Sequence, residues 1–542
     1  MKKNVLALSI AAMIGGLGFA SMASAGVIVG SGGAGNMTKP NITGFTLAQG
    51  GVGHALIVPY YTAQDGNMTV LHLVNTDAEN GKVVKVRFRG ASNSDDVLDF
   101  QLLMSPGDVW TGYVLRGEDG TATLGTNDNT CSIPSFAAAG GSASFKTLRL
   151  NSALTADQQA NETREGYVEI FNSADIPKAA APSLYATTKH NASGVAACDS
   201  TLINAALFDT DFEQADEAAA VTAGLNAPTG GLMGDWYILN MDQTTTFSGS
   251  ATALVGTAPA LPAVGNFVAF PQNSSITYAA ADAADLTTDP LLAGGGATKT
   301  WDGTLGGVIA PPVTANAQDF PDLSTGYYGG AAAAATAKAQ AESLTQALAV
   351  SSITNQYAKD ADINAKTDWV FSMPTRRYSV AMNYATSPVS RLFAAVDGAA
   401  DHSQFFYTDN TKVTNGQICV GTQGAVFRGR EEESKSGVPT FSPSASSSPS
   451  MCGETSVLSF GEGVAAPSVL GASVAREDAS AGSIFTHGWG VLTTTNKPAA
   501  GAAVGLPILG YSVQKLTNSF SGSGFAANFG VTWPHRFVLV NP

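Results

Sequence analysis

Three clusters of carboxylates are the groups in this sequence whose types and spacing could do chemistry. Carboxylates are hard oxygen ligands, and Ca²⁺ binds about 6–8 such oxygens at roughly 2.3–2.6 Å. None of the clusters matches an EF-hand loop or a Ca²⁺-binding nonapeptide repeat. Asp-rich turns also cap helices and solubilise loops, so each cluster has a purely structural interpretation as well. The candidate Ca²⁺ ligands are Asp95, Asp96 and Asp99; Glu118, Asp119 and Asp128; and Asp209, Asp211 and Glu213.

The sequence contains no recognisable catalytic motif. Residues 471–475 come nearest to the nucleophile elbow G-x-S-x-G but lack its closing glycine. The zinc motif H-E-x-x-H, the phosphate loop G-x-x-x-x-G-K-[ST] and a helix-opening G-x-G-x-x-G are all absent from the sequence. The histidines are too scattered to suggest a shared site, which favours packing or surface roles: His54, His72, His190, His402, His487 and His535. We therefore predict no catalytic residue and no enzyme activity.

Aromatic residues near the end of the chain offer a second kind of chemistry. Trp489, Tyr511 and Trp533 could stack on sugar rings as a carbohydrate-binding platform. The alternative is that they pack in the core, as large aromatic side chains usually do.

The elements that would position these groups are β-strands, most clearly over residues 54–115. Residues 82–89 alternate between apolar and basic side chains, which predicts a half-buried strand with Lys85, Arg87 and Arg89 facing solvent. An apolar run at 68–74 precedes it, and Asn80-Gly81 supplies the tight turn. Further strands are expected at 98–104 and 109–114. This succession predicts a β-sandwich.

The N-terminus predicts export. Residues 1–25 have a basic start, an apolar stretch and the small-residue cleavage site Ala23-Ser24-Ala25, as in a signal peptide. No later stretch has the ~18 apolar residues of a membrane helix. The formal net charge is -15, and charged residues are 13% of the chain against ~25% in typical soluble proteins. Without a basic patch to replace phosphate counterions, nucleic-acid partners are not expected.

The cysteines all lie in the part of the chain expected to be exported: Cys131, Cys198, Cys419 and Cys452. An even number in an oxidising compartment predicts disulfides, although sequence permits three pairings. We favour Cys131 with Cys198 and Cys419 with Cys452, because each pair then stays within one region. The alternative is free buried thiols.

The chain is too long for one ordinary domain. We expect a mainly β protein with Ig-like or jelly-roll-type sandwich regions and a small, partly helical Gly/Ala-rich insertion. Helices are expected at 209–220 and from 331 to about 350. One large sandwich with an insertion and two separate β-domains both fit the pattern. The expected boundaries are 1–25 signal peptide, 26–53 flexible leader, 54–205 first β-sandwich, 206–365 mixed insertion, and 366–542 second β region with a Ser/Pro loop at 431–450.

Several short segments resemble a family of uncharacterised secreted proteobacterial proteins known only as cell surface proteins. The segments are Val58-Pro59-Tyr60-Tyr61, Leu73-Val74-Asn75-Thr76, Val84-Lys85-Val86-Arg87-Phe88-Arg89-Gly90, Ser105-Pro106-Gly107-Asp108-Val109-Trp110, Thr126-Asn127-Asp128-Asn129, Asp368-Trp369-Val370-Phe371 and Trp533-Pro534-His535-Arg536. The resemblance implies an export route and a surface setting, and it supplies no catalytic or binding residue.

Two functional hypotheses follow. The first is a non-catalytic, exported structural or interaction protein of the cell surface, which associates with itself or with other surface components. Exposed sheet edges or the leader could join its subunits. The second is a secreted carbohydrate-binding module or polysaccharide hydrolase, which would use the tail aromatics and paired acids. Apart from the candidate Ca²⁺, neither hypothesis requires a cofactor.

Overall fold

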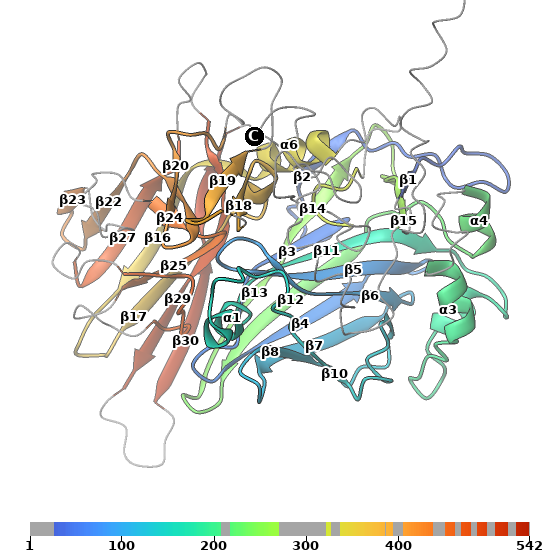
Figure 1. Ribbon diagram of the computed structural model, residues 1–542, viewed down its shortest axis with the longest axis horizontal. Coiled ribbons are helices and arrows are strands. Elements are labelled where there is room, and N and C mark those ends of the chain that lie inside the picture. The colour runs from blue at the N-terminus through green and yellow to red at the C-terminus, as the bar shows by residue number, and fades with distance from the viewer. Residues whose placement is uncertain are drawn as a thin grey trace, which may run out of the picture.

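Two β-sandwiches standing side by side make up the fold (Figure 1). The structure is a computed structural model, and it describes residues 26–207, 217–269, 321–326, 337–384, 386–393, 405–436, 450–460, 468–478, 485–495, 504–518 and 527–540. The expected signal peptide, residues 1–25, lies outside this part of the chain.

The first sandwich packs a seven-stranded sheet, sheet I, against a six-stranded sheet, sheet II. Sheet I has the strand order β2 (Gly44–Leu47), β14 (Thr252–Thr257), β3 (Ala55–Thr62), β11 (Glu165–Ile176), β5 (Gly81–Gly90), β6 (Asp96–Met104) and β9 (Cys131–Ile133). Sheet II has the order β10 (Ser142–Ser144), β8 (Ala122–Gly125), β7 (Val109–Arg116), β4 (Asn67–Asn75), β12 (Leu232–Asn240) and β13 (Thr245–Ser250). The prediction of a β-sandwich is confirmed.

The second sandwich packs sheet III against sheet IV. Sheet III has the order β23 (Ser434–Ser436), β22 (Gly424–Gly429), β27 (His487–Thr493), β16 (Ala349–Ala358) and β28 (Leu506–Pro507), and β31 (Arg536–Leu539) also pairs with β16. Sheet IV has the order β26 (Arg476–Asp478), β25 (Thr455–Phe460), β17 (Lys366–Ser372), β29 (Leu509–Thr517) and β30 (Asn528–Pro534). Short ladders join β1 (Gly26–Ile28) to β15 (Phe267–Ala269), β18 (Val380–Asn383) to β19 (Ser390–Phe393), and β20 (Thr411–Thr414), β21 (Gln417–Gly421) and β24 (Ser450–Cys452) to one another.

Sheet IV connects the cores of the two sandwiches because both of its faces are buried. Trp369 and Phe460 face sheet III, in one hydrophobic cluster. Val370 and Tyr511, on the opposite face, belong to the core of the first sandwich. The ring of Tyr511 stacks on Trp236 of β12 with centroids 4.4 Å apart. The molecule therefore has two sandwiches with a shared apolar interface, which lies between the alternatives of one large sandwich and two separate domains.

Sheet I is also covered on both faces, by sheet II on one side and by helices on the other. Apolar residues of its outer face pack against α2 (Leu184–Thr188), α3 (Ser200–Leu207) and α4 (Glu217–Thr222) near one end, and against α6 (Ala337–Leu348) near the other. Another helix, α1 (Ala156–Glu162), begins at a capping box between Thr155 and Gln158. The helix expected from 331 is described from Ala337, and most of the one expected at 209–220 lies outside the described residues.

The prediction that 82–89 is half-buried is wrong. Lys85 and Arg87 are 0% exposed, and all of β5 is buried. The alternation of apolar and basic residues is real, but the basic row faces acidic partners on neighbouring strands rather than water. A single strand cannot reveal that its neighbours supply compensating charge.

Two of the expected regions differ from the structure. Residues 26–53, expected as a flexible leader, contribute β1 and β2, which pair with β15 and β14. The expected insertion at 206–365 supplies β12, β13 and β14 to the first sandwich and β16 to the second. Within that region the chain crosses from sheet II to sheet I at Ala251, between β13 and β14.

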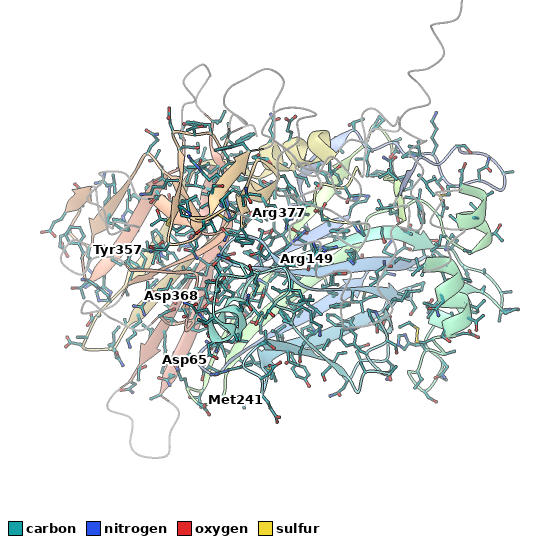
Figure 2. The ribbon with its side chains drawn as sticks, viewed as in Figure 1. Asp65, Arg149, Met241, Tyr357, Asp368 and Arg377 are labelled. Atoms are coloured by element: carbon teal, nitrogen blue, oxygen red, sulfur yellow. A yellow bond between two sulfur atoms is a disulfide. The ribbon has the colours of Figure 1, made fainter. Side chains whose placement is uncertain are left out.

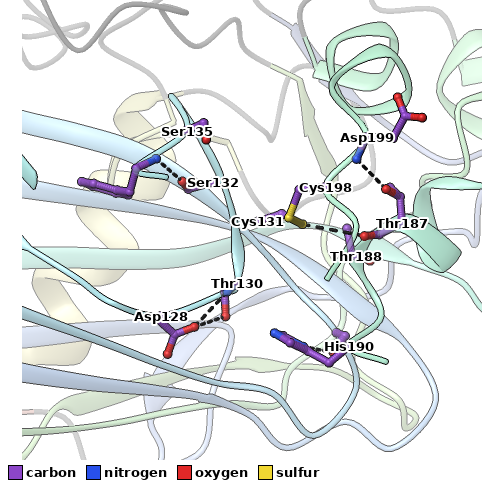
Figure 3. The surroundings of a disulfide bond; sticks show 12 residues. Asp128, Thr130, Cys131, Ser132, Ser135, Thr187, Thr188, His190, Cys198 and Asp199 are labelled. Atoms are coloured by element: carbon purple, nitrogen blue, oxygen red, sulfur yellow. Dashed lines mark hydrogen bonds between the residues drawn. A yellow bond between two sulfur atoms is a disulfide. The ribbon is translucent and has the colours of Figure 1, made fainter. Parts of the chain in front are cut away.

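Two disulfides stabilise the sandwiches locally. Cys131 of β9 bonds to Cys198, next to α3, which ties the edge of sheet I to the helices that cover it (Figure 3). Cys419 of β21 bonds to Cys452 of β24, and these two residues also face each other in the ladder. Both bonds join the cysteines that the sequence analysis paired. The two cysteines of each bond are 67 and 33 positions apart in the sequence, respectively.

The helices of the described ranges are all too short or too polar to cross a lipid bilayer.

Candidate functional site

The densest group of ionisable side chains lies on β5 and continues to the place where the two sandwiches meet. Each basic residue of β5 faces a carboxylate from another strand or loop. Lys82 Nζ lies 2.9 Å from Asp175 of β11, Lys85 pairs with Asp99 of β6, and Arg87 pairs with Asp96 and Asp99. All these side chains are at most 4% exposed. Leaving one such charge without its partner typically costs about 3–5 kcal/mol, so the pairs strongly favour this strand order over alternatives.

Arg89, the last basic residue of the row, reaches toward the second sandwich. Its Nε lies 3.3 Å from Glu169 Oε1 of β11, and its Nη2 lies 3.5 Å from Asp322 Oδ2. Asp322 belongs to residues 321–326, and it also lines a small apolar cavity between Phe45, Phe171 and Leu344. Arg89 thus holds this short segment over the outer face of sheet I.

Two consecutive arginines extend the charged group from the second sandwich. The short helix η4 (Arg376–Tyr378) follows β17 and carries both. Arg376 Nε donates to Glu454 Oε2 at 2.6 Å, and Arg377 Nη1 donates across the interface to the carbonyl of Ser94 at 2.6 Å. Figure 2 shows Arg377 where the sandwiches meet. Ser94 has a φ of 63°, which turns its carbonyl toward Arg89 as well, at 3.4 Å.

Asp95 and Glu162 are two carboxyls of this region whose pKa values are raised toward neutral pH. The hydroxyl of Tyr384 donates to Asp95, which joins the turn after β5 to the second sandwich. Burial raises the pKa of Asp95 to about 6, although this hydrogen bond acts in the opposite direction. Burial also raises the pKa of Glu162 to about 7, and the charges of Asp95 and Glu165 add to the effect. Both groups therefore change charge within the physiological range.

Glu165 fastens a loop of the second sandwich to the first. Its Oε1 accepts hydrogen bonds from the backbone N–H groups of Ser473 and Val474 at 2.7 and 3.0 Å, and its Oε2 accepts one from Ala475 at 3.2 Å. Gln64 and Tyr60 donate to the same carboxylate at 2.8 and 3.1 Å. Burial raises its pKa, while the three backbone N–H groups and Gln64 lower it.

The other end of this loop is held by Asp368 of β17. Its Oδ2 accepts hydrogen bonds from Ser468 Oγ at 2.6 Å and from the N–H of Leu470 at 2.9 Å. The carbonyl of Leu470 in turn accepts from Asn67 Nδ2 at 2.8 Å. We call residues 468–475 the clasp loop, because Asp368 anchors it to the second sandwich and Glu165 to the first.

The histidines of the described residues have structural partners. His535 is buried, with Nε2 at 2.8 Å from the carbonyl of Val370 and Nδ1 at 2.9 Å from Asn355 Nδ2. Burial lowers the pKa values of His535 and His54 to about 4. His72 bonds to Tyr237 and Thr111, His487 to Asp360, and His190 lies 3.7 Å from Asp108. His402 lies outside the described residues.

Two of the candidate Ca²⁺ clusters lie within the described residues, and neither forms an oxygen cage there. Asp96 and Asp99 are committed to the cations of β5, whereas their neighbour Asp95 bonds to Tyr384. Asp119 and Asp128 accept hydrogen bonds from Thr121 and Thr130 in their own turns, as the structural interpretation predicted. The third cluster, Asp209, Asp211 and Glu213, lies outside the described residues. Within the described ranges, no three His, Cys, Asp or Glu side chains are placed to hold a metal ion.

The three tail aromatics do not share a surface. Tyr511 is buried against Trp236, and Trp533 is partly buried on β30. Trp489 of β27 is 41% exposed on sheet III, where the guanidinium of Arg428 lies 5.8 Å from its ring centre. The packing interpretation therefore applies to Tyr511, and Trp489 stands apart from the other two.

Sequence reasoning missed Glu165 and Arg377, which bond directly from one sandwich to the other. It also missed the charged groups around them: Glu162, Asp322, Asp368, Arg376 and Glu454. Their partners are distant in the chain, and Glu165 and Ser473 are 308 positions apart. A lone Asp in the apolar run at 367–371 was the one local signal, since a charge in a buried strand requires a partner.

No known protein family, curated protein or solved structure matches this chain.

Proposed function

We propose that this protein is a non-catalytic, exported structural or interaction protein of the cell surface. The observation that carries the proposal is the use of the ionisable groups between the sandwiches. Arg377, Glu165 and Asp95 each form a hydrogen bond from one sandwich to the other. These three residues fix the position of one sandwich relative to the other, as expected for a rigid structural subunit.

Two further features support the extracellular setting. The chain has two disulfides, and disulfides persist mainly in oxidising compartments. The expected signal peptide at 1–25 supplies the route. The alternative of a carbohydrate-binding module is weakened, because Tyr511 is buried and cannot form a sugar-binding platform with Trp489 and Trp533.

The proposal is tested by locating the native protein. Intact producer cells are treated with a membrane-impermeant biotin reagent and fractionated. The chain is also purified and examined by negative-stain imaging. We expect labelling on intact cells and ordered assemblies of the purified protein. A cytoplasmic protein with no surface labelling would contradict the proposal, and release of reducing sugars from polysaccharide would favour the hydrolase instead.

A further inference from the structure

The outer face of sheet II is broad and almost free of charge. Strands β4, β7 and β12 alternate between side chains that point into the core and side chains that are partly exposed. The strand pairing arranges the outward side chains in rows: Val109, Val74 and Met233; Thr111, His72, Asp235 and Ser250; Gly125, Tyr113, Val70, Tyr237 and Ser248; and Met68, Leu239 and Thr246. We call this set the uncharged face.

The aromatic side chains of the uncharged face are held in place. The ring of Tyr113 lies across Gly125, where an added Cβ would come within 2.4 Å of its Cζ. His72 bridges Tyr237 Oη at 2.9 Å and Thr111 Oγ1 at 3.1 Å, and the His72 and Tyr237 ring centres are 5.3 Å apart. Between the two tyrosines, Val70 is only 5% exposed. The surface is thus ordered before any partner arrives, which lowers the entropic cost of docking.

Charge indicates which partner this face suits. The whole chain has a formal net charge of -15, so two copies repel each other over most orientations. Among the rows of the uncharged face, Asp235 is the one ionisable carboxylate, and it accepts a hydrogen bond from Ser250 at 2.7 Å. None of these side chains is a lysine or arginine. A strongly charged partner finds nothing to pair with here, whereas a second copy meets a surface that does not repel it.

The size and composition of the face also match a protein interface. Five strands spaced ~4.8 Å apart, each with about seven residues at ~3.3 Å, cover roughly 550 Å², approaching the ~800 Å² that each partner of a standard interface buries. Tyrosine and methionine are enriched, and charged residues depleted, in interface cores. Val109 is 46% exposed, and Met241, which follows β12, is 75% exposed.

We propose that the uncharged face is a self-association surface, on which a second copy of this chain docks sheet against sheet with the same residues on both sides. The proposal deepens the structural role proposed above and rests on it. A two-fold arrangement places the uncharged face of each copy on that of the other, so no complementary second surface is required.

The test measures self-association of the exported full-length chain by sedimentation velocity over a wide concentration range. In one variant, Val74→Glu, a carboxylate enters between Val109 and Met233 in the first row of the face. In a second, Val109→Glu, it enters at a more exposed and more tolerant position. The matched control is Val426→Glu, which changes a 36% exposed strand valine on β22 of sheet III. Circular dichroism verifies that each variant is folded.

We expect the wild-type chain to dimerise, both variants on the uncharged face to weaken dimerisation at least about tenfold through buried like charges, and the control to match wild type. Higher salt strengthens the wild-type dimer by screening the net charge. A wild-type dimer that Val74→Glu and Val109→Glu leave intact would refute this surface while the structural role stands. A chain that stays monomeric would overturn the proposal, and binding of a soluble glycan by that monomer would assign the face to carbohydrate. Absence from the cell surface would in addition remove the proposed function.

Discussion

Replacing Glu162 by glutamine is expected to stabilise the protein at neutral pH and to have no effect in mild acid. The pKa of Glu162 is about 7 in the folded chain, against 4.5 for an ordinary glutamate. A raised carboxyl pKa means that the folded state prefers the protonated form. Its stabilising contribution is therefore complete below pH 4.5 and is lost as the pH rises through about 7. Glutamine keeps the uncharged shape at every pH.

The magnitude follows from the distance between the two pKa values. At 1.36 kcal/mol per pKa unit, the gap between 4.5 and about 7 corresponds to at most about 3 kcal/mol. Because Glu162 is only partly buried by its surroundings, we expect a gain of about 1–3 kcal/mol for Glu162→Gln above neutral pH. Part of that gain is relief of repulsion from the neighbouring carboxylates of Asp95 and Glu165.

The assay is urea unfolding of wild type and Glu162→Gln at a series of pH values from about 3.5 to about 8, which brackets both pKa values. The control is Glu118→Gln, which removes an exposed carboxylate near the start of a turn. The difference in unfolding free energy between wild type and Glu162→Gln grows with pH, and that for the control stays near zero. The reasoning is refuted if Glu162→Gln is less stable than wild type at the alkaline end, or if the difference does not change with pH.

Three further outcomes are expected. In NMR titrations, His535 and His54 stay neutral until the pH falls to about 4. The stability that comes from burying the neutral rings is therefore present above pH 6.5 and is lost as the pH falls toward 4. Titration midpoints near 6.5 would contradict their burial. Glu165→Ala leaves the N–H groups of Ser473, Val474 and Ala475 without their acceptor, so we expect the free energy of unfolding to fall by about 3 kcal/mol. Amide exchange in the clasp loop should become faster, whereas the control Glu118→Ala should leave it unchanged. Unchanged exchange in Glu165→Ala would refute the clasp. Removing either disulfide by paired Cys→Ala changes is expected to cost about 4 kcal/mol, and slightly more for Cys131–Cys198 because its loop is longer; thermal unfolding of the two double variants gives the order, and the reverse order would contradict the chain-entropy argument.

Local patterns predicted the strands better than they predicted what surrounds them. The alternation at 82–89 correctly separates Val84 and Val86 from Lys85 and Arg87. The error concerned the environment of the basic row, which depends on Asp96 and Asp99 from β6 and on Glu169 from β11. Periodicity shows which residues share a face of a strand. Whether that face is buried depends on other elements, further along the chain, that pack against it.

The candidate site shows the same limit for acidic residues. Asp95 and Asp96 are adjacent in sequence, yet one bonds to Tyr384 of the second sandwich and the other to Arg87 within sheet I. Neighbouring residues at the start of a strand point to opposite sides, so residues that cluster in the sequence are separated in space.

The cysteines were easier to pair, because each disulfide joins residues of the same region, and the entropic cost of bringing two segments together is smaller when they are close in the sequence.

The crossing of the chain at Ala251 has a consequence for the order in which the protein can fold during synthesis. β12 completes the middle of sheet II beside β4, and β14 fills the gap in sheet I between β2 and β3. Neither sheet of the first sandwich can therefore close until residues 232–257 have emerged, although most of their strands are made much earlier. The second sandwich likewise waits for β31, close to the last residue. Pairing of such distant segments is slow and leaves strand edges open in the meantime. A chain with this connectivity completes the sheets of both sandwiches only late in its synthesis.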